Sequence, residues 1–226
     1  MSIPVDKYEI TFQSWNSVAD LYQEKFMGLD LYNDTYDRFC NLVEKPGATI
    51  FEIGCGPGNI TKYLLAKRPD FKIEAIDVAP NMITLAKENN PAATFRVMDC
   101  RVLDSALTDK QQQFPLFDAV MCGFCMPYLS KADCSKLLKD SAALLNNKCI
   151  IYFSAIEGNY EDSGFEKGSS GHSSYVYYYS EQELLEMLKE TGFEAVEIIR
   201  KAFQKPDGTP STHLIFIARK KFNNYL

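Results

Sequence analysis

The hydrophobic and polar positions of the chain follow two patterns in alternation. Short runs rich in β-branched and aromatic residues are each followed by a segment whose apolar residues recur three and four positions apart, as on one face of a helix. Five runs of the first kind occupy residues 48–54, 71–78, 93–99, 117–124 and 148–156. Strands that alternate with helices form a parallel sheet with helices on both faces and right-handed crossovers. The pattern therefore predicts a doubly wound α/β domain.

The last part of the chain predicts a reversal in this sheet. Two further strand-like runs cover residues 193–203 and 212–221, and the linker 204–211 is rich in turn residues and has no helical pattern. A parallel pair needs a crossover of a dozen or more residues, so these two strands are expected to be antiparallel neighbours. The expected sheet is mostly parallel and seven-stranded, with an antiparallel last strand.

Helical patterns dominate the first part of the chain. Residues 14–26 and 30–43 each place apolar side chains on one face of a helix. The sequence Lys-Pro-Gly at 45–47 then interrupts the pattern. We therefore expect an N-terminal helical cap over residues 1–45 and a sheet domain over residues 46–226.

Residues 158–180 interrupt the alternation of strands and helices. The segment is rich in glycine, serine and tyrosine and contains His172. A long loop in a compact domain usually has a function or is mobile, and this one could bring His172 to a substrate as a general base. An equally weighted alternative is a strand edge with half-buried tyrosines. A new helix is expected from Ser180, because Ser180 and Glu183 form a capping box.

Composition narrows the range of partners. The net charge of -6 and a pI near 5.1 disfavour a nucleic-acid backbone, which usually selects a basic surface. No apolar run is long enough to span a bilayer, and the N-terminus lacks the basic and apolar regions of a signal peptide. Seven cysteines, an odd number, do not suggest a disulfide framework, so we expect a reducing cytoplasm. Their spacing, with only two histidines in the chain, does not predict a metal site.

A glycine-rich turn follows the first predicted strand. Gly54, Gly56 and Gly58 stand at alternate positions before a helical segment. Such a turn lets a ligand approach the main chain and directs the free N–H groups of the helix start toward it. Dinucleotide enzymes use the spacing G-x-G-x-x-G to bind a pyrophosphate, and here the third glycine comes one residue early. The spacing alone therefore does not identify the ligand.

Carboxylates at three strand ends are more specific. Glu52 precedes the glycine turn, where it would repel a pyrophosphate and attract a cationic ligand. Asp77 ends the second strand, where an acid can bind both hydroxyls of a ribose, and Asp99 ends the third, where it could accept from an adenine amino group. Three acids around a glycine-rich turn indicate a pocket for a positively charged nucleoside. S-adenosylmethionine has a sulfonium, an ammonium group and no phosphate, and it fits this description.

The successive strand ends resemble the motifs of the class I S-adenosylmethionine-dependent methyltransferases: FEIGCGPGN, IEAIDVAPNMITLAK, VMDC and FDAVMCGFCMPYL. The resemblance covers about residues 45–220 and implies a Rossmann-like methyltransferase fold. It also implies cofactor-binding residues at the strand ends and in the cap: Tyr22, Glu52, Gly54, Cys55, Gly56, Asp77, Val78, Met82, Asp99, Cys100 and Cys122. Glu52 would act through the loop and bound water, Tyr22 from the cap, and Cys122 near the sulfonium.

The same resemblance implies a role for each part of the pocket. Residues 54–56 would line the methionine part of S-adenosylmethionine, and Asp77 would bind its ribose. Val78 and Met82 would lie beside the adenine, and residues 99–100 would reach the adenine edge.

The sequence therefore predicts methyl transfer from S-adenosylmethionine to a small molecule. An in-line displacement at a sulfonium needs alignment and exclusion of water more than a fixed catalytic group, and orientation alone can supply roughly 7–11 kcal/mol. If the acceptor is an oxygen or a nitrogen, His172 and Tyr128 are the candidates for a base. The acceptor pocket is expected between the N-terminal helices and residues 124–130 and 158–180. The sequence is compatible with an O, N, C or S acceptor and with any oligomeric state.

Two alternatives remain open from the sequence. A nicotinamide (NAD)-dependent oxidoreductase can use a similar sheet, although Glu52, the early third glycine and the reversed last strand disfavour it. A catalytically silent S-adenosylmethionine-binding module would keep the same acids, so the sequence does not exclude one.

Overall fold

A computed structural model describes residues 6–104, 114–168, 171–205 and 208–221. The strands are β1 (Thr49–Ile53), β2 (Lys72–Asp77), β3 (Thr94–Val97), β4 (Phe117–Cys122), β5 (Leu145–Glu157), β6 (Gly164–Lys167), β7 (Ser173–Val176), β8 (Tyr178–Tyr179), β9 (Phe193–Gln204) and β10 (Pro210–Lys220). The helices are α1 (Lys7–Ser17), α2 (Ala19–Phe26), α3 (Asn33–Leu42), α4 (Asn59–Lys67), α5 (Pro80–Asn89), α7 (Lys131–Leu144) and α8 (Glu181–Glu190). Short 3-10 turns form η1 (Cys100–Val102), η2 (Met126–Tyr128) and η3 (Tyr160–Asp162).

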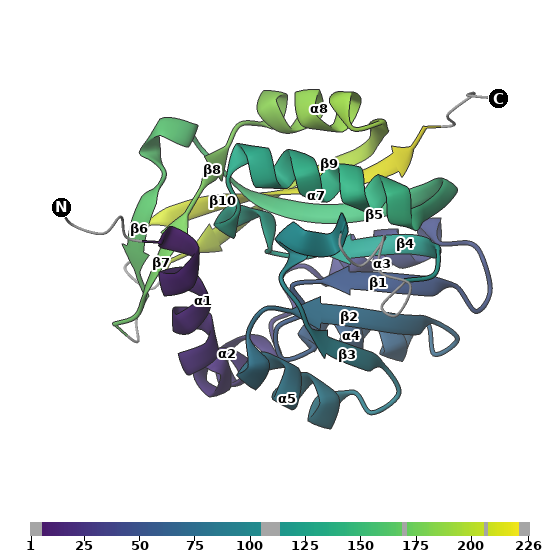
Figure 1. Ribbon diagram of the computed structural model, residues 1–226, viewed down its shortest axis with the longest axis horizontal. Coiled ribbons are helices and arrows are strands. Elements are labelled where there is room, and N and C mark those ends of the chain that lie inside the picture. The colour runs from purple at the N-terminus through teal and green to yellow at the C-terminus, as the bar shows by residue number, and fades with distance from the viewer. Residues whose placement is uncertain (1–5, 105–113, 169–170, 206–207, 222–226) are drawn as a thin grey trace.

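The central sheet has the predicted topology. Its strand order is β3-β2-β1-β4-β5-β10-β9 (Figure 1). The pairs from β3 to β5 are parallel, whereas β10 is antiparallel to both β5 and β9. The seven-stranded, mostly parallel sheet with an antiparallel last strand is thereby confirmed. The two-residue strand β8 adds an eighth strand, because Tyr178 pairs with Ile156 at the end of β5.

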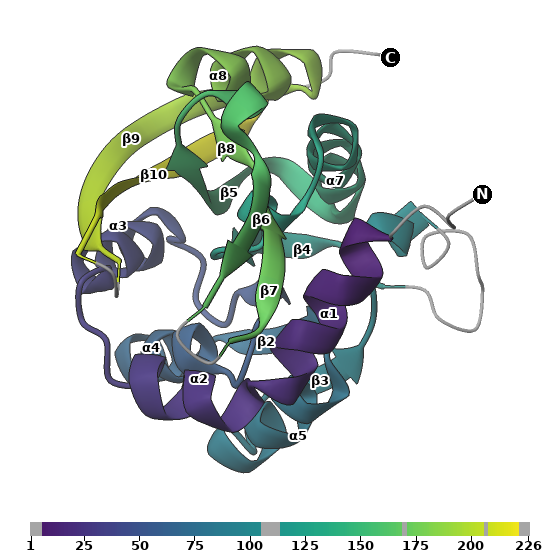
Figure 2. The ribbon, with the colours of Figure 1, turned by 90° about the vertical axis from the view of Figure 1, so that its left-hand side faces the viewer.

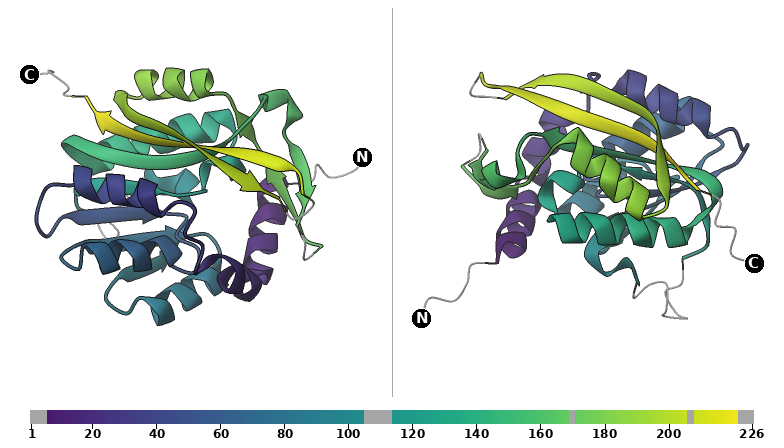
Figure 3. Two further views of the ribbon diagram at one scale, coloured as in Figure 1. Left: turned by 180° about the vertical axis from the view of Figure 1, so that it is seen from behind. Right: turned by 90° about the horizontal axis from the view of Figure 1, so that it is seen from above.

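Helices cover both faces of the sheet, as the near-continuous apolar runs predict. Helices α3, α4 and α5 pack on one face and α7 and α8 on the other (Figure 3). The consecutive residues Ile50 and Phe51 of β1 point to opposite faces, and each is fully buried in a different core cluster. Because α3 supplies Tyr36 and Phe39 to one of these clusters, it belongs to the layer on the sheet.

The first predicted helix is two helices. Residues 14–26 were expected to be continuous, but α1 ends at Ser17 and α2 begins at Ala19. Val18 leaves the helical conformation, with φ -103° and ψ 14°, so α1 contacts both β7 and α5 whereas α2 contacts α5. Ser14 of α1 donates to the Ser173 carbonyl of β7, whereas α2 buries Ala19 beside α5.

Of residues 158–168 and 171–180, ten lie in the strands β6, β7 and β8 and three in η3, so the expectation of a segment without regular elements is wrong and the alternative of a strand edge is right. β6 and β7 form an antiparallel hairpin that lies along α1 (Figure 2). Each strand has only four residues. β7 packs on α1 and shows no alternation of buried and exposed positions, and the alternation in β6 is too short to mark a strand in the sequence. The capping box of Ser180 and Glu183 begins α8 as predicted.

Candidate active site

A pocket lies where β1, β2, β3 and β4 end, on the side of the sheet flanked by α1 and α2 (Figures 1 and 2). Ligands of open α/β sheets bind at this edge. The lining residues are Phe12, Trp15, Tyr22, Gly54, Gly56, Ile76, Asp77, Val78, Met82, Met98, Asp99, Cys100, Gly123, Phe124, Cys125, Tyr128 and Leu129. We call this the first pocket. Its volume of about 110 Å³ is small for a nucleoside, so binding one requires the side chains of the cap to move.

The glycine turn is fastened to the end of β2 by its own backbone. The N–H groups of Gly54 and Cys55 both donate to the Ile76 carbonyl, at 2.8 and 3.0 Å. The Gly56 N–H donates to Asp77 Oδ2 at 2.9 Å. Gly56 has φ +53°, a conformation that L side chains rarely adopt, and a Cβ there would lie 3.7 Å from the Tyr22 ring. A side chain at position 56 would therefore narrow the space between the turn and the cap.

Asp77 is held in one orientation at the floor of the first pocket. Its Oδ1 accepts from the Ala79 N–H at 2.8 Å while Oδ2 accepts from Gly56. Burial raises the pKa of Asp77 from its ordinary value, and the backbone donors oppose that rise. A carboxylate fixed in this way presents its remaining lone pairs to donors such as ribose hydroxyls.

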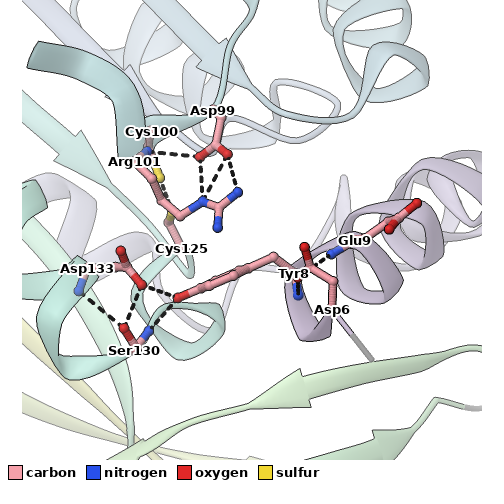
Figure 4. A network of polar contacts seen from close by, with 9 residues as sticks. All are labelled: Asp6, Tyr8, Glu9, Asp99, Cys100, Arg101, Cys125, Ser130 and Asp133. Carbon is pink, nitrogen blue, oxygen red and sulfur yellow. Dashed lines mark hydrogen bonds and ion pairs between the residues drawn. The ribbon is translucent and has the colours of Figure 1, made fainter. Parts of the chain in front are cut away.

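Asp99 lines the first pocket, but its carboxylate already has a partner. Arg101 pairs with it at 2.6 Å, and Asp99 Oδ1 accepts from the Arg101 N–H at 2.9 Å to cap η1. The predicted contact of Asp99 with an adenine amino group would therefore share the carboxylate with a guanidinium. Figure 4 shows this pair beside Cys100, whose Sγ lies 3.7 Å from Cys125 Sγ.

Arg101 also connects the pocket edge to the cap. Its guanidinium stacks over the ring of Tyr8, 3.9 Å from the centroid. The Tyr8 hydroxyl accepts from the Ser130 N–H at 2.9 Å and donates to Asp133, at the start of α7 (Figure 4). We call this set of contacts the Tyr8 latch. It fixes α1 to η1 and to α7 at once.

Most of the predicted cofactor-binding residues meet in the first pocket. Eight of the eleven line it: Tyr22, Gly54, Gly56, Asp77, Val78, Met82, Asp99 and Cys100. Cys55 and Cys122 are buried and do not line the pocket. Gly123 and Cys125, which follow Cys122 in the sequence, line it instead. Of the two candidate bases, Tyr128 lines the pocket, whereas His172 is exposed and lines neither cavity.

Glu52 lies beneath the glycine turn and does not line the pocket. Its Oε2 accepts from the Thr61 hydroxyl at 2.5 Å, and its Oε1 is buried without a partner among the described residues. Burial raises the pKa of Glu52 to about 8, so the group is mostly protonated at neutral pH. The expected attraction of a cationic ligand by a charged Glu52 is therefore wrong, while a role exerted through the loop fits its position.

A second, larger cavity adjoins the first pocket. Its volume is about 720 Å³, within the usual range for small-molecule sites. Four aromatic residues line both spaces and form a shared wall: Trp15, Tyr22, Phe124 and Tyr128. The other lining residues are Phe26, Leu29, Tyr32, Tyr36, Asn59, Pro127, Ile156, Glu166, Lys167, Gly168, Ser174, Val176, Phe203, Lys205, Ser211 and His213. Most of them come from residues 26–36, the 124–130 segment and the 158–180 segment, as expected. The others come from the start of α4, from β5 and from the region of β9 and β10.

Sequence reasoning missed two kinds of site residue. Trp15 lies seven positions before Tyr22, two helical turns away, and its ring packs edge-on against those of Tyr22 and Tyr128. That spacing could have pointed to it. His213 lies within an ordinary strand pattern, and nothing around it in the sequence indicates a cavity.

The charges of the first pocket limit its ligands. Asp77 and Asp99 are the only charged residues of its described lining, which contains no lysine, arginine or histidine. Phosphate groups are usually bound by such cations or by helix N-termini. The lining instead suits a ligand with hydroxyl, amino and cationic groups. In the described part of the chain, no cluster of histidine, cysteine and carboxylate side chains has the arrangement of a metal site.

Comparison with known proteins agrees with this chemistry. A family model described as a methyltransferase domain matches residues 50–148. The chain is 29% identical over 168 residues to malonyl-[acyl-carrier protein] O-methyltransferase of Anoxybacillus flavithermus, which covers 69% of this chain and 58% of that protein. It is 24% identical over 216 residues to carboxy-S-adenosyl-L-methionine synthase of Campylobacter jejuni, which covers 84% of this chain and 89% of that protein. The chain thus spans less than two thirds of the first of these relatives.

Solved structures share the whole fold. The 1,6-didemethyltoxoflavin-N1-methyltransferase of Burkholderia thailandensis, solved with bound 1,6-didemethyltoxoflavin and S-adenosylhomocysteine, has a TM-score of 0.70 at 18% identity. The alignment covers 98% of this chain and 94% of that one. At this identity the likeness concerns the fold alone. The chain is thus similar to methyltransferase domains over residues 50–148, and it shares their fold and the motifs at the strand ends.

Proposed function

We propose that the chain binds S-adenosylmethionine in the first pocket and directs its methyl group to a small molecule in the second cavity. The observation that carries this proposal is a glycine turn next to a fixed carboxylate, Asp77, in a lining without cations. The early third glycine, Gly58, and the reversed last strand disfavour the alternative of a nicotinamide-dependent oxidoreductase.

The residues present fit this cofactor. Asp77 would hold the ribose hydroxyls, and Gly56 leaves the space that a Cβ would fill toward Tyr22. Val78 and Met82 offer apolar surface for the adenine. When bound, the cofactor supplies an electrophilic methyl group on a sulfonium. The chain contributes binding, orientation and the exclusion of water by the cap.

The shared aromatic wall favours the second cavity as the acceptor site. Tyr22, Phe124 and Tyr128 face both spaces, so a molecule in the cavity lies against the same side chains as the cofactor. Burial raises the pKa of Tyr128 well above its usual range, which makes its hydroxyl a poor base at neutral pH. We therefore assign Tyr128 to positioning, and His172 has no role in this proposal.

The cap and the cellular setting belong to the same proposal. We propose that α1 and α2 form the cap, with α3 part of the sheet domain. None of the helices in the described ranges is both long and apolar enough to cross a bilayer. All seven cysteines are free, which supports a reducing compartment such as the cytoplasm. The net charge of -6 supports a small-molecule acceptor over a nucleic acid.

A transfer assay tests this function. The protein is incubated with S-adenosylmethionine that carries tritium in its methyl group and with a protein-free extract of small molecules, and labelled products are counted. We expect a labelled product with the wild type and at least tenfold less with Gly56→Ala, whose Cβ would narrow the pocket. Gly192→Ala is the matched control, since Gly192 has φ +85° and open space around it. Both variants lose about 1–2 kcal/mol of stability from backbone strain, but only Gly56→Ala loses transfer.

The outcomes separate the proposal from its alternatives. Binding of the cofactor with no labelled product in any extract would support a silent binding module. Equal loss of transfer in Gly56→Ala and Gly192→Ala would show that strain, and not the pocket, explains the effect.

A further inference from the structure

The first residues of β10 place two polar side chains, those of Ser211 and His213, in the lining of the second cavity. Ser211 and His213 stand two positions apart, so their side chains project from the same face of the strand. Further along that face, Ile215 and Ile217 are buried in the core with α3 and α4. The apolar face of the strand therefore becomes polar where the core ends and the cavity begins, although Ser211 and His213 are only 9% and 7% exposed.

The imidazole of His213 is fixed by aromatic rings. It stacks on Phe203 at 5.0 Å between centroids and lies nearly parallel to the ring of Tyr32. Its Nδ1 lies 2.7 Å from the Tyr32 hydroxyl. A buried hydroxyl hydrogen needs an acceptor, and Nδ1 is the acceptor that the described contacts offer to Tyr32. With Nδ1 accepting, the other ring nitrogen of a neutral imidazole carries a hydrogen.

His213 stays neutral in this setting. Burial lowers the pKa of His213 to about 4, and the nearby cation Lys205 adds to the effect. The neutral ring then acts as a hydrogen-bond donor through Nε2–H at neutral pH. Because the pKa of His213 lies far below neutral pH, its imidazole is too weak a base to act as a general base there.

Ser211 provides a second donor. Its Oγ is buried and has no hydrogen-bond partner among the described residues. A buried hydroxyl without a partner is costly, so a ligand or a water that accepts from it would be favoured. Two neighbouring donors on one strand face therefore call for a group that accepts.

The charges of the cavity agree with an acceptor that is negative. The charged lining residues are Glu166, Lys167 and Lys205. Lys205 Nζ pairs with Glu166 at 2.9 Å, and these two charges offset one another. The charged lining thus leaves an excess of one positive charge, on the exposed Lys167. Apart from Asn59 and Ser174, the remaining walls are mostly aromatic and aliphatic, which suits a flat, apolar body.

We infer that the second cavity recognises a flat, apolar molecule carrying an anionic oxygen group such as a carboxylate, and that Ser211 and His213 bind that group. The inference rests on the proposed function for the identity of this cavity as the acceptor site. Such an acceptor arrives deprotonated, so its methylation would need no base from the protein. That agrees with the neutral state of His213 and of the cavity tyrosines.

Calorimetry with three naphthalene probes tests the inference. The protein is saturated with S-adenosylhomocysteine at pH 7 and titrated with 2-naphthoate, 2-naphthol and 2-naphthylmethylamine, which share the flat body and differ in charge. We expect 2-naphthoate to bind roughly tenfold tighter than the other two, since a hydrogen bond to a charged group adds about that much. Ser211→Ala and His213→Phe should each weaken 2-naphthoate about tenfold and leave S-adenosylhomocysteine binding unchanged.

A matched control uses another buried serine. Ser141 Oγ on α7 is also buried and unpartnered among the described residues, and it lines neither cavity, so Ser141→Ala should bind 2-naphthoate like the wild type. Unchanged S-adenosylhomocysteine binding shows that each variant is folded. No preference for 2-naphthoate, or wild-type affinity in both variants, overturns the inference. No binding of S-adenosylhomocysteine to the wild type would instead contradict the proposed function.

Discussion

At the scale of single residues, Glu52 shows how burial changes the meaning of a charge. Its place before the glycine turn suggests an attractive charge for a cation, but its 1% exposure makes ionisation costly. In the folded protein the carboxyl supports the turn through Thr61 as a mostly neutral group. The sequence position of Glu52 predicted a charged group at the pocket, whereas the fold buries it beneath the glycine turn and raises its pKa.

This difference predicts a pH-dependent effect of Glu52→Gln. The folded pKa of about 8 lies above the unfolded value near 4.5, so the stability that depends on protonated Glu52 is full below pH 4.5 and falls as pH rises toward 8. A glutamine at position 52 is uncharged at every pH, so burying it adds no pH-dependent term to the free energy of unfolding. Between pH 5 and pH 8, urea unfolding should therefore show the variant gaining about 3 kcal/mol relative to the wild type.

Glu88→Gln is the control for that measurement, because Glu88 is an exposed residue of α5. It should follow the wild type at every pH. If the difference between Glu52→Gln and the wild type stays constant from pH 5 to pH 8, Glu52 is ionised in the folded protein and the account of it is wrong.

The sequence predicted residues of the first pocket better than residues of the second cavity. Gly56 and Asp77 were predicted because a bare turn and an acid at a strand end leave a local pattern in the sequence. Ser211 and His213 were not, because they become neighbours of Tyr32 only when β10 inserts between β5 and β9. Residues brought together by pairing of distant strands leave no such pattern.

At the scale of elements, the Tyr8 latch controls the position of α1. One side chain joins the cap to η1, which borders the first pocket, and to the N-terminus of α7. On its other side α1 bonds to β7, where the Tyr175 N–H donates to Thr11 Oγ1 at 2.9 Å. Because the first pocket is small, the side chains that α1 and α2 contribute to it have to move when a nucleoside enters.

Tyr8→Phe should loosen α1 without unfolding the sheet. The variant keeps the ring under Arg101 but removes the hydroxyl, which leaves the Ser130 N–H without that partner. The expected loss is about 1 kcal/mol, which corresponds to roughly fivefold faster hydrogen exchange in residues 7–17. Tyr160→Phe is the control, since the Tyr160 hydroxyl also accepts from a backbone N–H at the start of α7, that of Lys131, but does not bond to α1. Equal exchange of α1 in both variants would contradict the latch.

Strands were predicted correctly where they are long and buried on both faces of the sheet. β5 and β10 are buried on both faces along most of their length and carry continuous apolar runs. The antiparallel pairing of β9 with β10 was predicted from the composition of the linker 204–211. The hairpin of β6 and β7 was missed because strands of four residues show little periodicity. The break at Val18 was missed because both sides of it have helical propensity.

At the scale of the whole molecule, two neighbouring cavities differ in the charge of their lining. The carboxyl ends of β1 to β4 form a pocket with two acids and no cations in its described lining, and the segments around β10 form a larger cavity with an excess of one positive charge. Aromatic residues stand between the two. This arrangement favours a cationic donor on one side and an anionic acceptor on the other, which electrostatic attraction would hold against each other.

The central claim is that the first pocket takes a cationic adenosine compound and not a dinucleotide. Titration calorimetry of the wild type with S-adenosylhomocysteine, S-adenosylmethionine and NADH tests it most directly. We predict binding of the first two and no heat from NADH, with roughly tenfold to hundredfold weaker binding of both in Asp77→Asn and no change in the exposed control Asp20→Asn. Tight binding of NADH, together with no heat from either adenosine compound, would contradict the account.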